Sequence, residues 1–283
     1  DLPVQRERHT GFPIIPATSI KGSLRQRAER PPSQGGWGKG DDRVKDLFGP
    51  EAGDGANLHG GALGFTDARL LAFPVRSLHS VFAWVTCPLV LARFIRDLHR
   101  AGYAAEGIAA PPVPQEGQAL SPRGGLSTIV LEDLSLEASE NDQWRAQVGL
   151  LAQLFPNTNT HRFYRDKFTR DTLLIRDSDF QYLVRHATLV TARVSLNDRK
   201  TTTGDGGNLW YEETVPSDTL FYTLIQPEAS RRPGGGAGPE QIKTHLLELL
   251  RGDPAFVQFG GNETVGHGWC AVQAISSWAG GRP

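Results

Sequence analysis

Hydrophobic residues recur at helical spacing in four stretches of the chain. The pattern predicts helices over Ile20–Glu29, Leu89–Ala101, Asp142–Leu154 and Pro239–Leu250. Ser19 follows Pro16 and is expected to cap the first of these helices, because a serine hydroxyl accepts a backbone N–H at a helix start. Pro31 and Pro32 would then end that helix.

Alternating or short hydrophobic runs predict the strands. They fall within Ala62–Phe73, Ser127–Leu131, Leu183–Leu196, Leu209–Glu213, Thr219–Ile225, Val257–Phe259 and Cys270–Ile275. The first of these ranges is expected to hold one or two strands, broken at Asp67. Residues 33–42, 50–61 and 104–125 are rich in Gly and Pro and predict loops or irregular insertions. Short strands mixed with helices and long insertions are typical of the α+β class.

Composition narrows the class of protein only a little. At 39% hydrophobic and 22% charged residues the chain is an ordinary globular protein, and it has no run of the roughly 20 apolar residues that a membrane span needs. Cys87 and Cys270 lie far apart without a CxxC partner, which favours a reducing cytoplasm. The net charge of −1 argues weakly against a nucleic-acid binder, although the distribution of charge matters more than its sum.

The strongest local motif is a glycine cluster near the end of the chain. Gly260, Gly261, Gly266 and Gly268 lie within nine residues, and such a loop lets backbone amides approach a phosphate. It is neither a nucleotide P-loop nor a dinucleotide fingerprint, because the lysine and the glycine spacing of those motifs are missing. Composition alone favours the simpler interpretation of a tight turn.

Charged residues offer three weaker candidates. His9 stands beside Arg6 and Arg8, but a lone histidine in a loop is more often structural. Asp1 precedes this arginine-rich segment, where a carboxylate is able to bind a divalent metal or take a proton from a ribose hydroxyl. The range 161–176 interleaves arginines with aromatic residues, which suits a nucleic-acid surface and, more often, a helix face with snorkelling side chains. Zinc motifs and a GxSxG nucleophile elbow are absent from the sequence.

Several blocks, in order along nearly the whole chain, together resemble one known family. They are Asp1–Pro13 (DLPVQRERHTGFP), Ile15–Arg25 (IPATSIKGSLR), Leu47–Gly49, Gly64–Ala68, Pro74–Pro88, Leu209–Glu213 and the glycine cluster at 260–268. The chain thereby resembles the fourth-numbered backbone subunits of the type III-B (Cmr) CRISPR effector complex, within the RAMP superfamily. That family has about one strand and a loop ahead of the residue matching Asp1, so we expect such a segment to be missing from this sequence.

The resemblance implies a fold and an activity. The fold would be a single RAMP domain over 1–283: a modified ferredoxin-like, RNA-recognition-motif palm with a helical insertion at about 89–180 and a thumb β-hairpin at about 194–216. The subunit would bind guide RNA, associate with itself in a helical filament and with other Cmr subunits, and cleave complementary target RNA at regular intervals. A divalent metal, expected to be Mg²⁺, would be required.

The same resemblance implies roles for particular residues. Asp1 corresponds to the family's catalytic, metal-binding aspartate, and Glu212 to a residue that assists cleavage. The expected RNA contacts are Arg6, Arg8, His9, Ser19, Lys21, Arg25, Trp210, Gly260, Gly261, Gly266 and Gly268. Two alternatives stay open. The chain would be a non-catalytic guide-RNA scaffold, or an endonuclease of the same superfamily that processes guide precursors and uses His9 as its base.

Overall fold

The computed structural model describes residues 2–51, 53, 58–103, 109–195, 201, 209–252 and 254–275. Its contacts divide the chain into two compact units. The first contains Asp1–Ile14, Arg69–Ala152 and Phe163–Tyr222, and the second contains Ile15–Ala68, Gln153–Arg162 and Thr223–Pro283. The chain passes between the units after residues 14, 68, 152, 162 and 222, so neither unit is one continuous segment. The single domain predicted over 1–283 stays a prediction.

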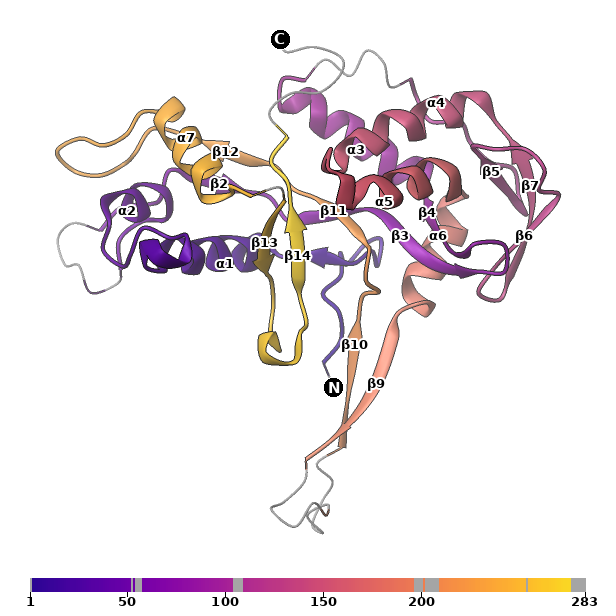
Figure 1. Ribbon diagram of the computed structural model, residues 1–283, viewed down its shortest axis with the longest axis horizontal. Coiled ribbons are helices and arrows are strands. Elements are labelled where there is room, and N and C mark those ends of the chain that lie inside the picture. Colours follow the sequence, from indigo (N-terminus) through magenta and orange to yellow (C-terminus); the bar gives the residue numbers. More distant parts are fainter. Residues whose placement is uncertain are drawn as a thin grey trace. The chain divides into compact units, whose positions relative to one another are not determined.

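An eight-stranded sheet forms the centre of the first unit (Figure 1). Its strands are β1 (Ile14–Ile15), β3 (Ala68–Ser77), β4 (Val81–Thr86), β5 (Gln118–Ser121), β6 (Thr128–Leu131), β7 (Leu134–Glu140), β8 (Thr172–Leu174) and β11 (Leu220–Tyr222). The order is β1-β3-β4-β8-β5-β7-β6, with β11 paired to β3. Ser77 of β3 also pairs with Leu131 of β6, so the sheet curls back on itself. Eight of the ten residues of β3 are buried, as expected for a strand covered on both faces.

Four helices accompany this sheet: α3 (Pro88–Arg100), α4 (Asp142–Leu151), α5 (Asn159–Asp171) and α6 (Asp177–His186). α3 begins with Pro88 at its first position, and its buried side chains lie on one face. The largest buried side chains include Trp84 and Trp144. Each indole N–H finds a backbone carbonyl, on Asp218 at 2.8 Å and on Thr172 at 3.0 Å, which removes the cost of burying a polar group.

The second unit is built from shorter elements. It contains α1 (Ala17–Glu29), α2 (Asp42–Phe48), β2 (Leu63–Phe65), β12 (Ile225–Pro227), α7 (Pro239–Leu249), β13 (Ala255–Gln258) and β14 (Trp269–Val272), with the 3₁₀ turns η1 (Pro32–Gln34), η3 (Ala152–Leu154) and η4 (Glu263–Val265). β2 pairs with β12, and β13 pairs with β14, both antiparallel. α1, α2 and α7 pack together through buried residues such as Leu24, Leu47 and Leu249.

The α+β class and most of the predicted elements are confirmed. The helices α3, α4 and α7 and the break between β2 and β3 at Asp67 lie where the periodicity placed them. One expectation is wrong. α1 begins at Ala17, not at Ile20, so Ser19 is not its N-cap; Pro16 holds that position, and Asp67 accepts from the Ala17 N–H at 2.8 Å. The strand predicted within 183–196 is confirmed by a strand at Leu189–Val194, and the first residues of that range belong to the end of α6.

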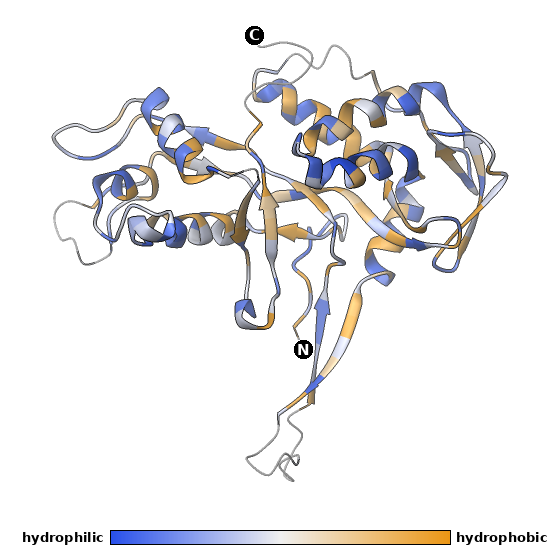
Figure 2. Ribbon diagram, in the orientation of Figure 1, coloured by the Kyte–Doolittle hydropathy of each residue, from blue (hydrophilic) through white to orange (hydrophobic). Residues whose placement is uncertain are grey.

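The predicted helical insertion also contains strands, and the predicted hairpin begins earlier than expected. The range 89–180 contains helices but also supplies β5 to β8 to the sheet. β9 (Leu189–Val194) pairs with β10 (Leu209–Thr214), so the hairpin predicted at 194–216 begins five residues earlier, and it extends away from the sheet of the first unit (Figure 1). Residues 196–200 and 202–208 of the predicted thumb lie outside the described residues. β9 begins with the hydrophobic residues Leu189 and Val190, both of which are exposed (Figure 2).

A buried ion pair fixes the turn between β3 and β4. Lys167 of α5 is 5% exposed and meets Asp171 at 3.0 Å. Its ammonium group also donates to the carbonyls of Ser80 and Phe82 and lies 4.3 Å from the centre of the Phe82 ring. Between those carbonyls, Val81 adopts a φ of 65°, a costly conformation for a β-branched residue. Lys167 therefore holds a strained turn against a helix.

Replacing this lysine should destabilise the first unit. We expect Lys167→Met to lower the free energy of unfolding by about 2 kcal/mol, because it removes the cation that Asp171 shares with the Ser80 and Phe82 carbonyls and leaves all three without this donor. Chemical denaturation measures the effect. Lys243→Met serves as the control, since Lys243 is about half exposed, and should change the value by no more than about 0.5 kcal/mol. Equal effects of the two substitutions would contradict a role for the buried pair.

Candidate functional site

The segment that follows Asp1 runs along the hairpin strand β10. The Leu2 N–H donates to the Tyr211 carbonyl at 2.8 Å, and the Glu213 N–H donates to the Leu2 carbonyl at 3.0 Å. Leu2 and Glu212 thus form a parallel bridge, although they lie far apart in the sequence. Asp1, the predicted catalytic and metal-binding residue, lies outside the described residues. The structure places its neighbour Leu2 beside the strand that carries the predicted Glu212.

Glu212 is itself held firmly by protein groups. It is 7% exposed, and its carboxylate accepts from the Arg193 Nε at 3.0 Å and from the Trp210 indole at 3.1 Å. The predicted residues Glu212 and Trp210 therefore contact each other within the β9–β10 hairpin, together with Arg193, which the sequence did not single out. A role for Glu212 in cleavage stays a prediction.

The next residue, Glu213, ties the N-terminal segment to β10. It accepts from Arg6 at 2.5 Å, from the Val4 N–H at 3.0 Å and from the Thr188 hydroxyl at 2.8 Å. Burial raises the pKa of Glu213, but these donors outweigh it and hold that pKa below its ordinary value. Glu213 is thus an anchor that sequence reasoning did not distinguish from its neighbour.

The three predicted basic residues of the N-terminal loop have different surroundings. The guanidinium group of Arg6 donates to the carbonyls of Gly11 and Val184, each at 2.9 Å, as well as to Glu213. Arg6 thereby shapes the loop. Arg8 and His9 are exposed, and the His9 side chain keeps 70% of its surface accessible. Of the three, Arg8 and His9 are the side chains best placed to meet a ligand.

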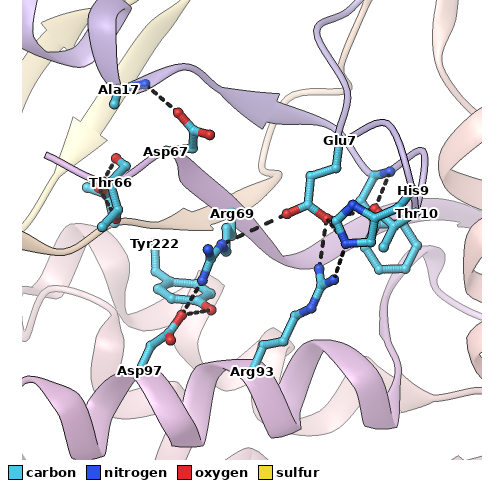
Figure 3. A network of polar contacts seen from close by, with 12 residues as sticks. Glu7, His9, Thr10, Ala17, Thr66, Asp67, Arg69, Arg93, Asp97 and Tyr222 are labelled. Atoms are coloured by element: carbon cyan, nitrogen blue, oxygen red, sulfur yellow. Dashed lines mark hydrogen bonds and ion pairs between the residues drawn. The ribbon is translucent and has the colours of Figure 1, made fainter.

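A network of charges fastens this loop to α3 and β3 (Figure 3). Glu7 accepts from Arg93 at 2.8 Å and from the Thr10 hydroxyl at 2.7 Å, and Arg93 also meets the His9 Nε2 at 2.9 Å. Burial raises the pKa of Glu7, yet the hydrogen bonds from Thr10 and Arg93 lower it below its ordinary value. Arg69 lies 3.9 Å from the same carboxylate. The loop that carries Arg8 and His9 is therefore fixed by ion pairs.

Arg69 extends the network to a second, more deeply buried carboxylate. It contacts Asp97 at 2.6 Å, and the Tyr222 hydroxyl donates to the same carboxylate at 3.0 Å. Burial raises the pKa of Tyr222, and the neighbouring Asp97 raises it further. Tyr222 therefore remains a hydrogen-bond donor at neutral pH. Asp97, which is 2% exposed, has both an ionic and a neutral partner.

The predicted phosphate-binding helix α1 belongs to the second unit. Ser19 lies in its first turn, and Lys21 follows two residues later. Arg25 is partly engaged, since it donates to Glu29 at 2.7 Å and to the Gly49 carbonyl at 3.1 Å. Arg27, which the sequence did not single out, donates to the carbonyls of Leu249 at 2.8 Å and Phe256 at 3.0 Å. This arginine joins α1 to the end of α7 and to β13.

The glycine cluster forms the turn of the β13–β14 hairpin. Gly260, Gly266 and Gly268 have φ values of 87°, 86° and 73°, which favour glycine, whereas Gly261 does not need this freedom. A Cβ on Gly268 would lie 1.9 Å from the Phe259 carbonyl oxygen. The tight-turn interpretation is therefore confirmed for this residue. Phosphate binding by the loop stays a prediction.

One glutamine organises the carbonyl groups of this loop. The Gln258 side-chain nitrogen lies 3.1 Å from the Gly260 carbonyl oxygen, 3.2 Å from that of Gly261 and 3.1 Å from that of His267. Holding these carbonyls around one donor fixes the backbone of the loop. The sequence offered little signal for this role, because a glutamine at the end of a strand is usually an exposed residue.

A match to a known family identifies the class of protein to which this chain belongs. A family model described as RAMP superfamily matches residues 1–271. The chain is therefore a member of the RAMP superfamily.

Comparison with individual relatives identifies the family within this superfamily. The CRISPR system Cmr endoribonuclease Cmr4 of Pyrococcus furiosus is 35% identical over 274 residues, which are 96% of this chain and 87% of the relative. The CRISPR system CMR subunit Cmr4 of Saccharolobus solfataricus is 24% identical over 287 residues, 95% of this chain and 86% of the relative. The chain thus belongs to the Cmr4 family.

Solved structures agree with this assignment. A crystal structure of oligomeric Cmr4 from Pyrococcus furiosus superposes with a TM-score of 0.69 at 31% identity, over 94% of this chain and 88% of that one. A structure of the type III-B Cmr-beta bound to cognate target RNA has a TM-score of 0.67 at 21% identity, over 94% and 86% of the two chains, and supports the fold alone.

The anchoring carboxylate Glu213 should make stability depend on pH. Because the folded protein holds its pKa below the ordinary value of 4.5, Glu213 stabilises the fold above that pH and loses its contribution as the pH falls through the lowered pKa. We expect Glu213→Gln to lower the thermal midpoint by about 3 °C at pH 7. The difference should shrink towards pH 3. The exposed Glu228→Gln is the control, and a difference that is constant with pH would contradict the prediction.

The glutamine anchor should control the order of the glycine loop. We expect Gln258→Leu to increase amide hydrogen exchange across residues 259–268 and to cost about 1 kcal/mol of local stability, because the loop carbonyls lose their shared donor. Hydrogen exchange followed by mass spectrometry measures this. Gln226→Leu, on the exposed side of β12, should leave the loop unchanged. Unaltered exchange in Gln258→Leu would show that the loop is fixed by its glycines alone.

Proposed function

We propose that this chain is a guide-RNA-binding backbone subunit of a type III-B CRISPR effector complex, and that it cleaves complementary target RNA at regular intervals. The observation that carries the proposal is its 35% identity, over 96% of its length, to a Cmr4 that is named an endoribonuclease. The association of the segment after Asp1 with β10 supports it, because that pairing brings the N-terminal motif and the Glu212 block together.

The proposed chemistry uses the target's own ribose. The 2′-oxygen attacks the adjacent phosphorus while the 5′-oxygen leaves, which yields a 2′,3′-cyclic phosphate and a 5′-hydroxyl. Asp1 would accept the proton of the 2′-hydroxyl, and water would protonate the leaving oxygen. DNA would be spared because it lacks the 2′-hydroxyl. Arg8 and His9, exposed on the fixed N-terminal loop, would hold the phosphate near this residue.

The requirement for Mg²⁺ is part of the same proposal. Among the residues that the structure describes there is no group of three or more His, Cys, Asp or Glu side chains able to hold a metal. These residues alone do not form a metal centre. Mg²⁺ often binds through one or two carboxylates together with substrate phosphates, so Asp1 and the RNA would have to supply its ligands. Its role would be to neutralise charge on the phosphate.

The proposed partners follow from the relatives. An oligomeric Cmr4 and a Cmr complex with target RNA have been solved, which supports self-association, a filament and contact with other Cmr subunits here. The cytoplasmic location predicted from the cysteines belongs to the proposal. No helix in the described ranges is long and apolar enough to cross a membrane.

A scaffold without catalytic activity is the second candidate function. The burial of Glu212 and its ion pair with Arg193 favour it, because both are what a structural glutamate would show. The guide-precursor nuclease has less support. Its expected base, His9, has its Nε2 atom at 2.9 Å from Arg93, so that nitrogen already has a protein partner.

Cleavage by the assembled complex tests the proposal. We expect Asp1→Asn to slow cutting of a labelled complementary RNA by roughly 100-fold or more, because the base is lost, while guide binding is retained. Cutting should also stop in chelator and at a position that carries a single 2′-deoxy substitution. The surface substitution Asp142→Asn is the matched control and should cut normally. Unchanged cutting by Asp1→Asn would leave the chain a scaffold.

A further inference from the structure

One face of α3 carries a row of arginines. Arg93, Arg96 and Arg100 are spaced by three and four residues, so they lie on the same side of the helix. Their side chains are 17%, 50% and 67% exposed, respectively. The opposite face is buried through residues such as Val90 and Phe94. The row therefore becomes more accessible towards the end of the helix.

The charge around this row is unbalanced. Arg69 and Arg8 lie on the elements next to it, which gives five arginines with Arg93, Arg96 and Arg100, against the two carboxylates Glu7 and Asp97. The formal sum is therefore 5 − 2 = +3, in a chain whose net charge is −1. This concentration of positive charge is the kind of distribution that matters for binding anions.

Arg96 and Arg100, the two outer arginines of the row, are not required to compensate the charge of the buried Asp97. That carboxylate already has Arg69 at 2.6 Å and the Tyr222 hydroxyl at 3.0 Å. The Arg96 Nε donates to Asp97 at 3.2 Å, and Arg100 approaches only to 3.8 Å, which is longer than a hydrogen bond. The side chains of Arg96 and Arg100 are nevertheless 50% and 67% exposed. The terminal nitrogens of Arg96 and the guanidinium group of Arg100 are therefore accessible to a further anion.

The row is joined to the N-terminal loop. Arg93 meets His9 at 2.9 Å and Glu7 at 2.8 Å, so the exposed Arg8–His9 pair and the helix face are held by the same network (Figure 3). We call Arg93, Arg96 and Arg100 with Arg8 and His9 the arginine stripe. Both of its parts belong to the first unit, so its geometry does not depend on the second.

We propose that the arginine stripe binds the phosphodiester backbone of an RNA strand, beyond the contacts of the N-terminal loop alone. The proposal rests on the proposed function. Guanidinium groups pair with phosphate oxygens through two parallel hydrogen bonds, and successive arginines one helical turn apart suit a row of phosphates. Recognition would be independent of sequence, because the stripe would contact the charged phosphates of the RNA and would not contact the edges of its bases.

Removing the two exposed charges tests the proposal in the assembled complex. Arg96→Gln with Arg100→Gln should weaken RNA binding by about tenfold at 0.15 M salt, to the same degree for two unrelated sequences. The slope of log affinity against log salt should fall by about 1.4, corresponding to two phosphates on a single strand. Lys243→Gln with Arg251→Gln removes the same charge from exposed positions within and just after α7 and should leave the slope unchanged.

Two arms distinguish the strand that is bound. One measures guide binding by the chain, and the other measures target binding by the guide-loaded complex. A reduced slope in either arm supports the proposal and identifies the strand. Unchanged slopes in both overturn it, and loss of complex assembly with intact RNA affinity would instead assign the stripe to an acidic protein partner. Cutting at saturating target is measured in parallel, so failure of the stripe is separable from failure of the nuclease assignment.

Discussion

The pairing of partly buried carboxylates with arginines is the constraint on which the first unit depends. Glu213 fixes the N-terminal segment to the hairpin, and Glu7 fixes the following loop to α3. Each carboxylate has at least two donors, because a buried charge with one partner would be costly. These contacts join parts of the chain about 200 and 90 residues apart, and thereby place the predicted catalytic segment beside β10.

The same ion pairs divide the basic residues of the loop between two tasks. Arg6 is engaged by carbonyls and Glu213, whereas Arg8 and His9 remain accessible. Arginine suits both tasks, since its five donors in a rigid plane match either carbonyls and carboxylates inside the protein or phosphates outside it. Residue type alone therefore did not separate structural arginines from those available to a ligand.

In the second unit, long side chains donate to backbone carbonyls for a similar purpose. Arg27 donates hydrogen bonds to carbonyls at the end of α7 and in β13, and Gln258 donates to carbonyls within the glycine loop. Backbone carbonyls left by a helix end or a tight turn need donors, and in this unit long side chains supply them. The result is that α1 and the glycine hairpin, two of the elements expected to contact RNA, are connected within one unit.

The sequence by itself determined the α+β class, the amphipathic helices α3 and α7, the break at Asp67 and the resemblance that the family match confirmed. Periodicity and motifs suffice for these because they depend on neighbours along the chain. Only the tertiary structure decided that Pro16 and Asp67, not Ser19, begin α1, that 183–186 is helical, and that Arg6, Arg27 and Gln258 are structural anchors. Each of these outcomes depends on a partner far away in the sequence or on a loop geometry that no local pattern encodes.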